Sequence, residues 1–378
     1  MLPYGRHHVD QDDIDAVIYV LKNQFLTQGA CVPAFEQALC DYTGANYAQA
    51  VNSGTSGLHI ACLAANIGEG DVVWTVPNSF VASANCAKYC GGDIDFVDID
   101  SVTRNISVAL LQAKIEGCDR LPKALIVVHF SGVSCDMQAI SAITRKHNII
   151  LIEDAAHALG GRYNGKPIGN CEYSDMAVLS FHPVKSITTA EGGAVITNNK
   201  TLYKRLVLFS QHGVSRDPQQ LLAQDQGDWY YEQQALGYNY RLSDLHGALG
   251  ISQLRKLDYF IQLRREKAAV YLQALAKSPL ILPPESSLRD SAWHLFTVEL
   301  QAHDRRVIFD QLRTQGIGVN VHYIPIHLQP YYQRLGFKRG HYPNAERFYS
   351  HALTLPLFPL MTDKEQQQVI DVLQQLLV

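Results

Sequence analysis

The sequence predicts an α/β fold with a mainly parallel central sheet. From about residue 47 to residue 200, short runs rich in β-branched residues alternate with helical stretches, which is the pattern of strand–helix–strand units. In a chain of 378 residues a single core would be unusually large, so a second, smaller domain is expected. We place a large α/β domain at residues 1–250 and a small α+β domain at residues 251–378.

Apolar periodicity predicts the elements of the large domain. Near the N-terminus, apolar residues recur at helical spacing, so Asp10–Leu21 is expected to be a helix with one buried face. The residues of that face are Ile14, Val17, Ile18 and Leu21. The predicted strands are Asp71–Val76, Ile94–Asp98, Ala124–Phe130, Ile149–Glu153, Met176–Phe181 and Gly193–Thr197.

The second half of the chain has a mixed pattern that predicts the smaller domain. The pattern is helical again over Trp229–Leu257 and over a long polar helix, Phe260–Ala276. A loop with two prolines, a strand-like run over Trp293–Leu300 and two further helices follow, the last ending at Gln368–Leu377. No repeat, low-complexity stretch or Ser/Gly linker is found, so the two domains are expected to be packed together.

Composition excludes several classes of protein. With 47% apolar and 18% charged residues, the chain is typical of globular proteins rather than of disordered or fibrous ones. The net charge of −4 and the absence of a block of like charges argue against nucleic acid as a partner. No apolar run approaches the ~20 residues of a membrane span, and no signal-peptide core is found. We therefore expect a cytoplasmic protein with no membrane contact.

The eight cysteines indicate free thiols rather than a disulfide framework, because the chain is long and no secretory signal is found. Cys86 and Cys90 are spaced so that both could face one side of a helix. Neither has a second Cys or His pair at the spacing of a zinc site. No metal is expected.

Polar residues that follow the predicted strands indicate where the chemistry lies, because ligands bind at the carboxyl ends of strands in open α/β sheets. Glu153 and Asp154 end one strand, and His157 follows three residues later. This places a carboxylate and an imidazole at the ligand edge. The alternative is a helix N-cap, since Asp is a good cap ahead of an Ala-rich segment.

Lys185 lies in the loop after the strand Met176–Phe181, among hydroxyl residues and glycines. A lysine in such a loop between apolar strands is expected to be partly desolvated and therefore nucleophilic at neutral pH. The alternative is a solvated surface lysine, which is the commoner case.

The segment Val51–His59 is a turn of small residues that leads into an apolar helix. Backbone N–H groups and hydroxyls at a helix N-terminus form an anion site that suits a phosphate. The turn has neither the Walker ending nor the Gly-x-Gly-x-x-Gly pattern. A Schiff-base lysine, an acid for a pyridine nitrogen and a phosphate site together match the requirements of pyridoxal phosphate.

The motifs that contain these residues resemble those of the DegT/DnrJ/EryC1/StrS family of sugar aminotransferases, and the resemblance covers nearly the whole chain. They are Asn52–Ser56, Glu153–His157, Ser180–Lys185, Glu191–Gly193 and Gly237–Arg241. The resemblance implies the pyridoxal-phosphate-dependent transferase fold type I, which is aspartate aminotransferase-like. Some family members have His in place of the lysine and dehydrate sugars, so Lys185 implies transamination.

The resemblance also implies catalytic roles. Lys185 would hold pyridoxal 5'-phosphate as a covalent aldimine and would move the proton between cofactor and substrate. Asp154 would pair with the pyridine nitrogen, and His157 would lie near the ring and its 3-hydroxyl. The phosphate would be held by Thr55, Ser56 and Ser180.

Further cofactor contacts are implied on the ring face and from a second subunit. Phe80 would stack on the ring, with plain core packing as the alternative. Asn239 or Arg241 would reach across to the phosphate or substrate of another chain. The resemblance thus implies a homodimer with shared active sites.

Within the family, the likeness is to members that use L-glutamate to aminate C4 of a UDP-linked 4-keto-6-deoxy-N-acetylhexosamine in pseudaminic acid biosynthesis, releasing 2-oxoglutarate. Amination at C3 and another nucleotide-linked keto sugar stay open. The implied substrate contacts are Thr27, Gln28, His182, Arg241, Tyr323 and His327. For both His322 and His327, substrate contact and core packing are the two open alternatives. A metal held by His322 and His327 is disfavoured, because Pro325 makes a helix between them unfavourable.

Two questions stay open. Arg216 and Arg241 are both candidates for the group that binds the glutamate carboxylate, because a guanidinium binds a carboxylate through two hydrogen bonds. A non-catalytic ligand-binding protein that keeps this fold is the alternative function. A nicotinamide-dependent dehydrogenase is disfavoured by the missing Gly-x-Gly-x-x-Gly turn.

Overall fold

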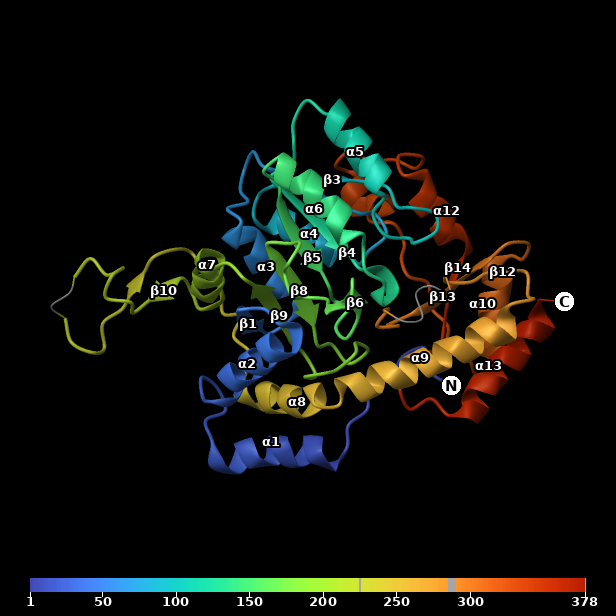
Figure 1. The fold of residues 1–378 in the computed structure, drawn as a ribbon, viewed down its shortest axis with the longest axis horizontal. Helices are drawn as coiled ribbons and strands as arrows, with labels where there is room; N and C mark the ends of the chain where they lie inside the picture. The colour runs from blue at the N-terminus through green and yellow to red at the C-terminus, as the bar shows by residue number, and fades with distance from the viewer. Residues whose placement is uncertain (224–225, 285–289, 378) are drawn as a thin grey trace.

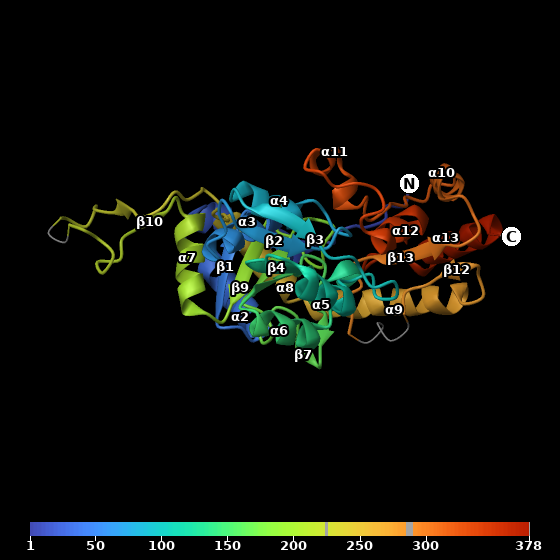
Figure 2. The same ribbon diagram turned by 90° about the horizontal axis from the view of Figure 1, so that it is seen from above.

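A seven-stranded sheet is the largest sheet of the computed structural model, which describes residues 1–223, 226–284 and 290–377 (Figures 1 and 2). Its strand order is β1-β9-β8-β5-β4-β2-β3. Strands β3, β2, β4, β5 and β8 are parallel to one another, whereas β9 is antiparallel to both of its neighbours. The prediction of a mainly parallel sheet is confirmed. The strands are β1 (Tyr47–Val51), β2 (Val72–Thr75), β3 (Asp93–Phe96), β4 (Ala124–Val128), β5 (Ile150–Asp154), β8 (Met176–Ser180) and β9 (Gly193–Thr197).

Helices cover both faces of this sheet, as the alternation of its side chains requires (Figure 2). On β5, Ile152 joins an apolar cluster with the helices of one face, whereas Leu151 joins a cluster with those of the other. The first face carries α3 (Gly54–Ala64), α4 (Ala82–Tyr89) and α7 (Lys200–Ser210). The second carries α2 (Cys31–Thr43), α5 (Val108–Gly117), α6 (Met137–Lys146) and α8 (Asp244–Leu254).

A separate apolar cluster lies in the C-terminal part of the chain. It is formed around the antiparallel sheet β12-β13-β14 and the long helix α9 (Leu257–Leu275). The N-terminal segment packs here too, since the N–H of Gly318 donates to the carbonyl of Leu2 at 2.7 Å. The remaining elements of this part are β12 (Leu280–Ile281), β13 (Phe296–Leu300), α10 (Arg305–Thr314), α11 (Pro330–Gln333), α12 (Pro343–His351), β14 (Ala352–Leu355) and α13 (Asp363–Leu376). Because α8 runs across residue 250, the domain boundary stays a prediction.

The first helix corrects one expectation. It forms as α1 (Gln11–Asn23), with Asp10 as its N-cap. Three of the four residues of the predicted apolar face are exposed, since Ile14 is 43%, Ile18 39% and Leu21 55% exposed, whereas Val20 is the apolar residue of α1 that is buried. Amphipathic spacing identifies an apolar face, but it does not require the partner of that face to lie in the same chain.

The region Trp229–Leu257 is a second correction, because it is helical only from Asp244. The residues before it belong to an arm that contains the short strands β10 (Val214–Ser215) and β11 (Glu232–Gln233). In Figures 1 and 2 this arm projects from the body beside α7. Its apolar side chains produced the helical pattern without being packed in a helix of this chain: Trp229 is 76% and Leu236 77% exposed.

In the described ranges, no helix is long and apolar enough to cross a membrane.

Candidate active site

A cavity of about 410 Å³ lies where β5 and β8 end, beside the segment that contains His322 and Tyr323, which we call the 320s segment. It brings together most of the predicted site residues, which come from five separate stretches of the chain. Those that line it are Thr55, Phe80, Asp154, His157, Ser180, His182, Lys185 and Tyr323. The carboxyl edge of the sheet is therefore the place where the motifs meet, as the rule for open α/β sheets predicts.

Asp154 is the last residue of β5 and is buried. Its Oδ2 accepts a hydrogen bond from the hydroxyl of Ser83 at 2.6 Å, and its Oδ1 accepts one from the N–H of Ala156 at 3.2 Å. The Ser83 hydroxyl is in turn 2.7 Å from that of Ser79. Turns rather than a helix follow Asp154, so the N-cap alternative is wrong. The carboxylate is oriented into the cavity by the start of α4.

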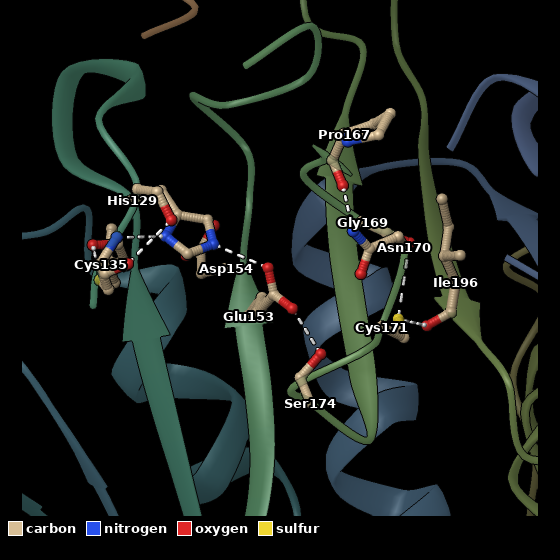
Figure 3. Close-up of polar contacts among 12 residues, drawn as sticks. His129, Cys135, Glu153, Asp154, Pro167, Gly169, Asn170, Cys171, Ser174 and Ile196 are labelled. Atoms are coloured by element: carbon tan, nitrogen blue, oxygen red, sulfur yellow. Dashed lines mark hydrogen bonds and ion pairs between the residues drawn. The ribbon is translucent and has the colours of Figure 1, made fainter. Parts of the chain in front are cut away.

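The side chain of the neighbouring carboxylate, Glu153, points to the opposite face of the sheet (Figure 3). It accepts a hydrogen bond from Nε2 of His129 at 2.8 Å and another from the hydroxyl of Ser174. Nδ1 of His129 accepts the N–H of Cys135 at 3.1 Å. These contacts join the ends of β4 and β5 behind the cavity, so Asp154 projects from a fixed edge.

Lys185 lies in the loop between β8 and β9, where its N–H donates to the carbonyl of His182 at 2.9 Å. The residue is half-buried in the cavity wall. Burial lowers the pKa of its amine to about 8, although the charge of Asp154 opposes that shift. A solvated surface lysine does not fit this position. At neutral pH a far larger fraction of this amine is uncharged than in a free lysine.

The N-terminus of α3 forms one wall of the cavity. Ser53 caps the helix, because its hydroxyl accepts the N–H of Ser56 at 3.1 Å. The hydroxyl of Ser56 is buried and donates to Asn52 at 2.6 Å. Ser56, expected to hold the phosphate, therefore stabilises the turn, whereas Ser53, Gly54 and Thr55 face the cavity.

Two glycines allow this helix to begin so close to the sheet. A Cβ on Gly193 would lie 2.6 Å from the backbone nitrogen of Gly54. A Cβ on Gly54 would lie 3.0 Å from Cβ of Ser180. Since no other residue type fits at Gly193, the free N–H groups of α3 and the hydroxyl of Ser180 can face the same small volume.

His157 and Phe80 line the cavity at different depths. Nε2 of His157 lies 3.0 Å from the hydroxyl of Tyr323, whereas its buried Nδ1 has no hydrogen-bond partner. Burial, with the positive charge of Lys185, lowers the pKa of His157 well below its ordinary value, so the ring is neutral. Phe80 is 58% exposed, which excludes core packing in this chain.

The residues present fit pyridoxal phosphate. The cavity has an amine with a lowered pKa, an oriented carboxylate, a helix N-terminus with free N–H groups and an imidazole nitrogen that lacks a partner. An aldehyde, a protonated pyridine, a phosphate and a phenolic hydroxyl would satisfy these four groups in turn.

Several predicted contacts lie outside the cavity of this chain. Thr27, Gln28 and Asn239 are exposed, and Arg241 is half-buried. None of the four is among the cavity residues. They come from the loop that follows α1 and from the end of the arm.

The structure also favours the packing alternative for His327. This side chain is fully buried, and its Nε2 lies 2.9 Å from Oε1 of Glu346. Its ring packs near those of Phe96 and Tyr342. A substrate contact by His327 does not fit this position in the core.

Sequence reasoning missed other residues of the site. Ser79 and Ser83 carried a weak signal, since they are spaced by one helical turn after a predicted strand. Tyr4 lines the cavity without any local pattern that marks it. Glu191 lines it as well and belongs to the motif Glu191–Gly193, although no role was expected for it. His322, for which substrate contact was one of two open alternatives, also lines the cavity. In the described part of the chain, no group of three or more His, Cys, Asp or Glu residues is arranged to hold a metal.

Comparisons with known proteins agree with this geometry. The DegT/DnrJ/EryC1/StrS aminotransferase family matches residues 7–374. The chain is 38% identical to the UDP-4-amino-4,6-dideoxy-N-acetyl-beta-L-altrosamine transaminase of Campylobacter jejuni, over 99% of this chain and 96% of that protein.

Solved structures of aminotransferases are similar as well. Helicobacter pylori PseC, an aminotransferase involved in the biosynthesis of pseudoaminic acid, matches with a TM-score of 0.91 and 31% identity over 100% of this chain and 99% of that one. The PLP-form of the putative sugar aminotransferase Spr1654 from Streptococcus pneumoniae matches with a TM-score of 0.90 and 26% identity, over 99% and 97%. The chain belongs to the DegT/DnrJ/EryC1/StrS aminotransferase family.

Proposed function

We propose that this protein is a pyridoxal-phosphate-dependent aminotransferase that moves the amino group of L-glutamate to C4 of a UDP-linked 4-keto-6-deoxy-N-acetylhexosamine. The observation that carries the reaction type is the single cavity shared by Lys185, Asp154 and the N-terminus of α3. The sugar class is supported by the identity with the altrosamine transaminase along nearly the whole chain.

Lys185 and Asp154 have different roles toward the cofactor in this proposal. When bound, pyridoxal phosphate supplies the aldehyde that takes up the amino group and the electron-poor ring that stabilises a carbanion. Nζ of Lys185 would hold the cofactor and would carry the proton to and from the reacting carbon. The carboxylate of Asp154, oriented by Ser83, holds the proton on the pyridine nitrogen.

The N-terminus of α3 binds the cofactor phosphate in this proposal. Free N–H groups at a helix start carry partial positive charge, and the hydroxyls of Thr55 and Ser180 add donors beside them. Phe80 packs against the ring from the open side of the cavity. Nδ1 of His157 would form a hydrogen bond with the ring hydroxyl of the cofactor, because this nitrogen is buried and has no other partner.

A second copy of the chain completes each site. Asn239, Arg241, Thr27 and Gln28 are absent from the cavity of their own chain, although the resemblance assigns them to substrate or cofactor. Large apolar side chains are also exposed on α1 and on the arm: Leu21 is 55%, Leu222 94% and Trp229 76% exposed. A homodimer would bury these side chains and bring the four residues to the partner's cavity.

Two variants test the shared site. Lys185→Ala and Asn239→Ala are each expected to impair turnover, and mixed dimers of the two should regain activity because one of their two sites has both residues. Sedimentation should give twice the mass of the chain. A monomer with full activity would contradict the shared site without affecting the assignment of Lys185.

The substrate is tested by product analysis. With the UDP-linked 4-keto-6-deoxy-N-acetylhexosamine and L-glutamate, we expect one 2-oxoglutarate for each C4 amine, as identified by NMR. A C3 amine, or turnover only with another nucleotide-linked keto sugar, would overturn the substrate while leaving the reaction type. No turnover and no cofactor binding would favour a non-catalytic protein of this fold.

A further inference from the structure

A second buried imidazole packs directly behind His157. The ring centroids of His157 and His294 lie 4.3 Å apart, with their planes tilted by 43°. His294 is 4% exposed and does not line the cavity, so it touches neither substrate nor cofactor in the proposed function. Its contacts toward the site run through His157.

The backbone of His294 is held by hydrogen bonds from two sides. Its N–H donates to the carbonyl of Ser131 at 3.0 Å, and its carbonyl accepts a hydrogen bond from Nη1 of Arg264 at 3.3 Å. The preceding residue, Trp293, has a φ of +48°. A left-handed φ in a bulky residue persists only where the surroundings determine it, so the position of His294 is enforced rather than adopted by default.

The loop that contains Ser131 also contacts His157. Gly132 has a φ of +96°, and a Cβ there would lie 2.9 Å from the carbonyl oxygen of His157 and 2.9 Å from the backbone nitrogen of Trp293. The N–H of Ala292 donates to the Gly132 carbonyl at 3.0 Å. The backbone of Gly132 is thus packed closely against both the backbone of His157 and that of Trp293, the residue before His294.

Neither ring has a hydrogen bond at Nδ1, and both nitrogens are buried. Burial lowers the pKa of His157 and of His294 well below the ordinary value, so both rings are neutral. The ionisable groups that face them from the surrounding elements reinforce this, because they are cations or neutral rings. They are Lys185 of the β8–β9 loop, Arg264 of α9, and His322 and Tyr323 of the 320s segment.

We propose that His294 is a positioning residue for the reaction, which fixes the ring of His157 from behind and keeps water from it. His157 in turn holds the hydroxyl of Tyr323 at the cavity wall through its Nε2. This inference rests on the proposed function for its kinetic consequence, but the geometry of the two rings stands without it.

The test compares two substitutions at one position. His294→Phe keeps an aromatic ring behind His157, whereas His294→Ala leaves a space that water can enter. Histidine-selective NMR of the holoenzyme measures the titration of His157, identified by its loss in His157→Gln. We expect His157 to titrate well below its ordinary value in the wild type and in His294→Phe. In His294→Ala we expect it to titrate near the ordinary value of about 6.5.

The kinetic readout accompanies the titration. In His294→Ala, the rate of the L-glutamate half-reaction should fall about 10- to 100-fold and gain an inflection near pH 6, with a small change in KM. His294→Phe should keep the flat profile and most of the rate. If His294→Ala does not fold, His294→Asn serves in its place, because it also leaves room for water.

Two results would overturn the proposal: a wild-type His157 that titrates near 6.5, or a His157 that stays neutral in His294→Ala with an unchanged rate. If the wild type shows no glutamate half-reaction at all, the proposed function fails. The NMR titration still decides whether His294 controls His157.

Discussion

The cofactor half and the substrate half of this site are built in different ways. The cofactor half is assembled inside one chain: Asp154 is buried and hydrogen-bonded, Lys185 has a lowered pKa, and α3 starts against the sheet. The residues proposed for the substrate half include Thr27 and Gln28, which are exposed in the loop after α1. In our proposal, Lys185 and Asp154 are therefore positioned by the fold of one chain, whereas substrate specificity depends on exposed segments.

This contrast has a physical basis. Catalytic groups need low mobility and altered pKa values, which a packed strand edge supplies through burial and hydrogen bonds. Loops that select a substrate can vary without disturbing the core. We therefore expect substitutions in the cofactor half to lower kcat strongly and substitutions in the substrate half to raise KM.

The largest effect is expected for Lys185→Ala. Loss of the amine removes both the covalent attachment and the proton carrier, so turnover should fall by about 10⁴-fold or more. Steady-state kinetics of the cofactor-loaded variant measure this fall. Lys166→Ala is the matched control, because Lys166 is paired with Glu172 on the surface and lies outside the cavity. Substantial turnover by Lys185→Ala would refute its role.

The next largest effect is expected for Asp154→Asn, which keeps the shape and the hydrogen bond but removes the charge. Without a counter-ion the pyridine nitrogen loses its proton, and kcat should fall about 100-fold or more. Ser83→Ala removes only one hydrogen bond to that carboxylate, so a smaller fall of about 10-fold is expected. Equal losses in the two variants would contradict the counter-ion role.

A change in KM rather than kcat is expected for Arg241→Ala. If this guanidinium binds the glutamate carboxylate, its loss should raise the apparent KM for L-glutamate about 10- to 100-fold. Arg216→Ala is the comparison, since the guanidinium of Arg216 lies over the ring of Tyr231 in the arm. An increase in KM in Arg216→Ala alone would move the assignment to Arg216.

The smallest expected effect is a shift in pH dependence. Only the neutral amine of Lys185 can bind the cofactor aldehyde, and its pKa is about 8. The rate at which the apoenzyme takes up pyridoxal phosphate should therefore rise with pH and level off above about 8. N-acetyl-lysine methylamide is the control, and its reaction should keep rising to about pH 10. The same inflection in both would show that the site does not lower this pKa.

The sequence predicted the centre of the fold and of the site better than its periphery. Strand runs such as Ala124–Phe130 and Met176–Phe181 are buried on both faces, so their apolar patterns directly reflect their surroundings. Asp154 and Lys185 follow such strands, and parallel strands place their ends at one edge. Local pattern therefore sufficed to bring them together.

The errors share a different cause, because they depend on contacts distant in sequence. The exposed face of α1 and the arm before Asp244 have apolar patterns whose partner is not in this chain's core. His327 belongs to a motif, but its ring is hydrogen-bonded to Glu346, which lies nineteen residues further along the chain. His294 carried no local signal at all, since its role arises only where Trp293 and Gly132 pack behind His157.

The most direct test of the central claim is the visible absorption spectrum of the protein with pyridoxal phosphate, before and after addition of L-glutamate. We predict a band of lysine-bound cofactor that disappears as the amine form of the cofactor arises, with one equivalent of 2-oxoglutarate released. Lys185→Ala should lack the initial band. A wild-type protein that shows no such band, or a band that Lys185→Ala retains, would contradict the account.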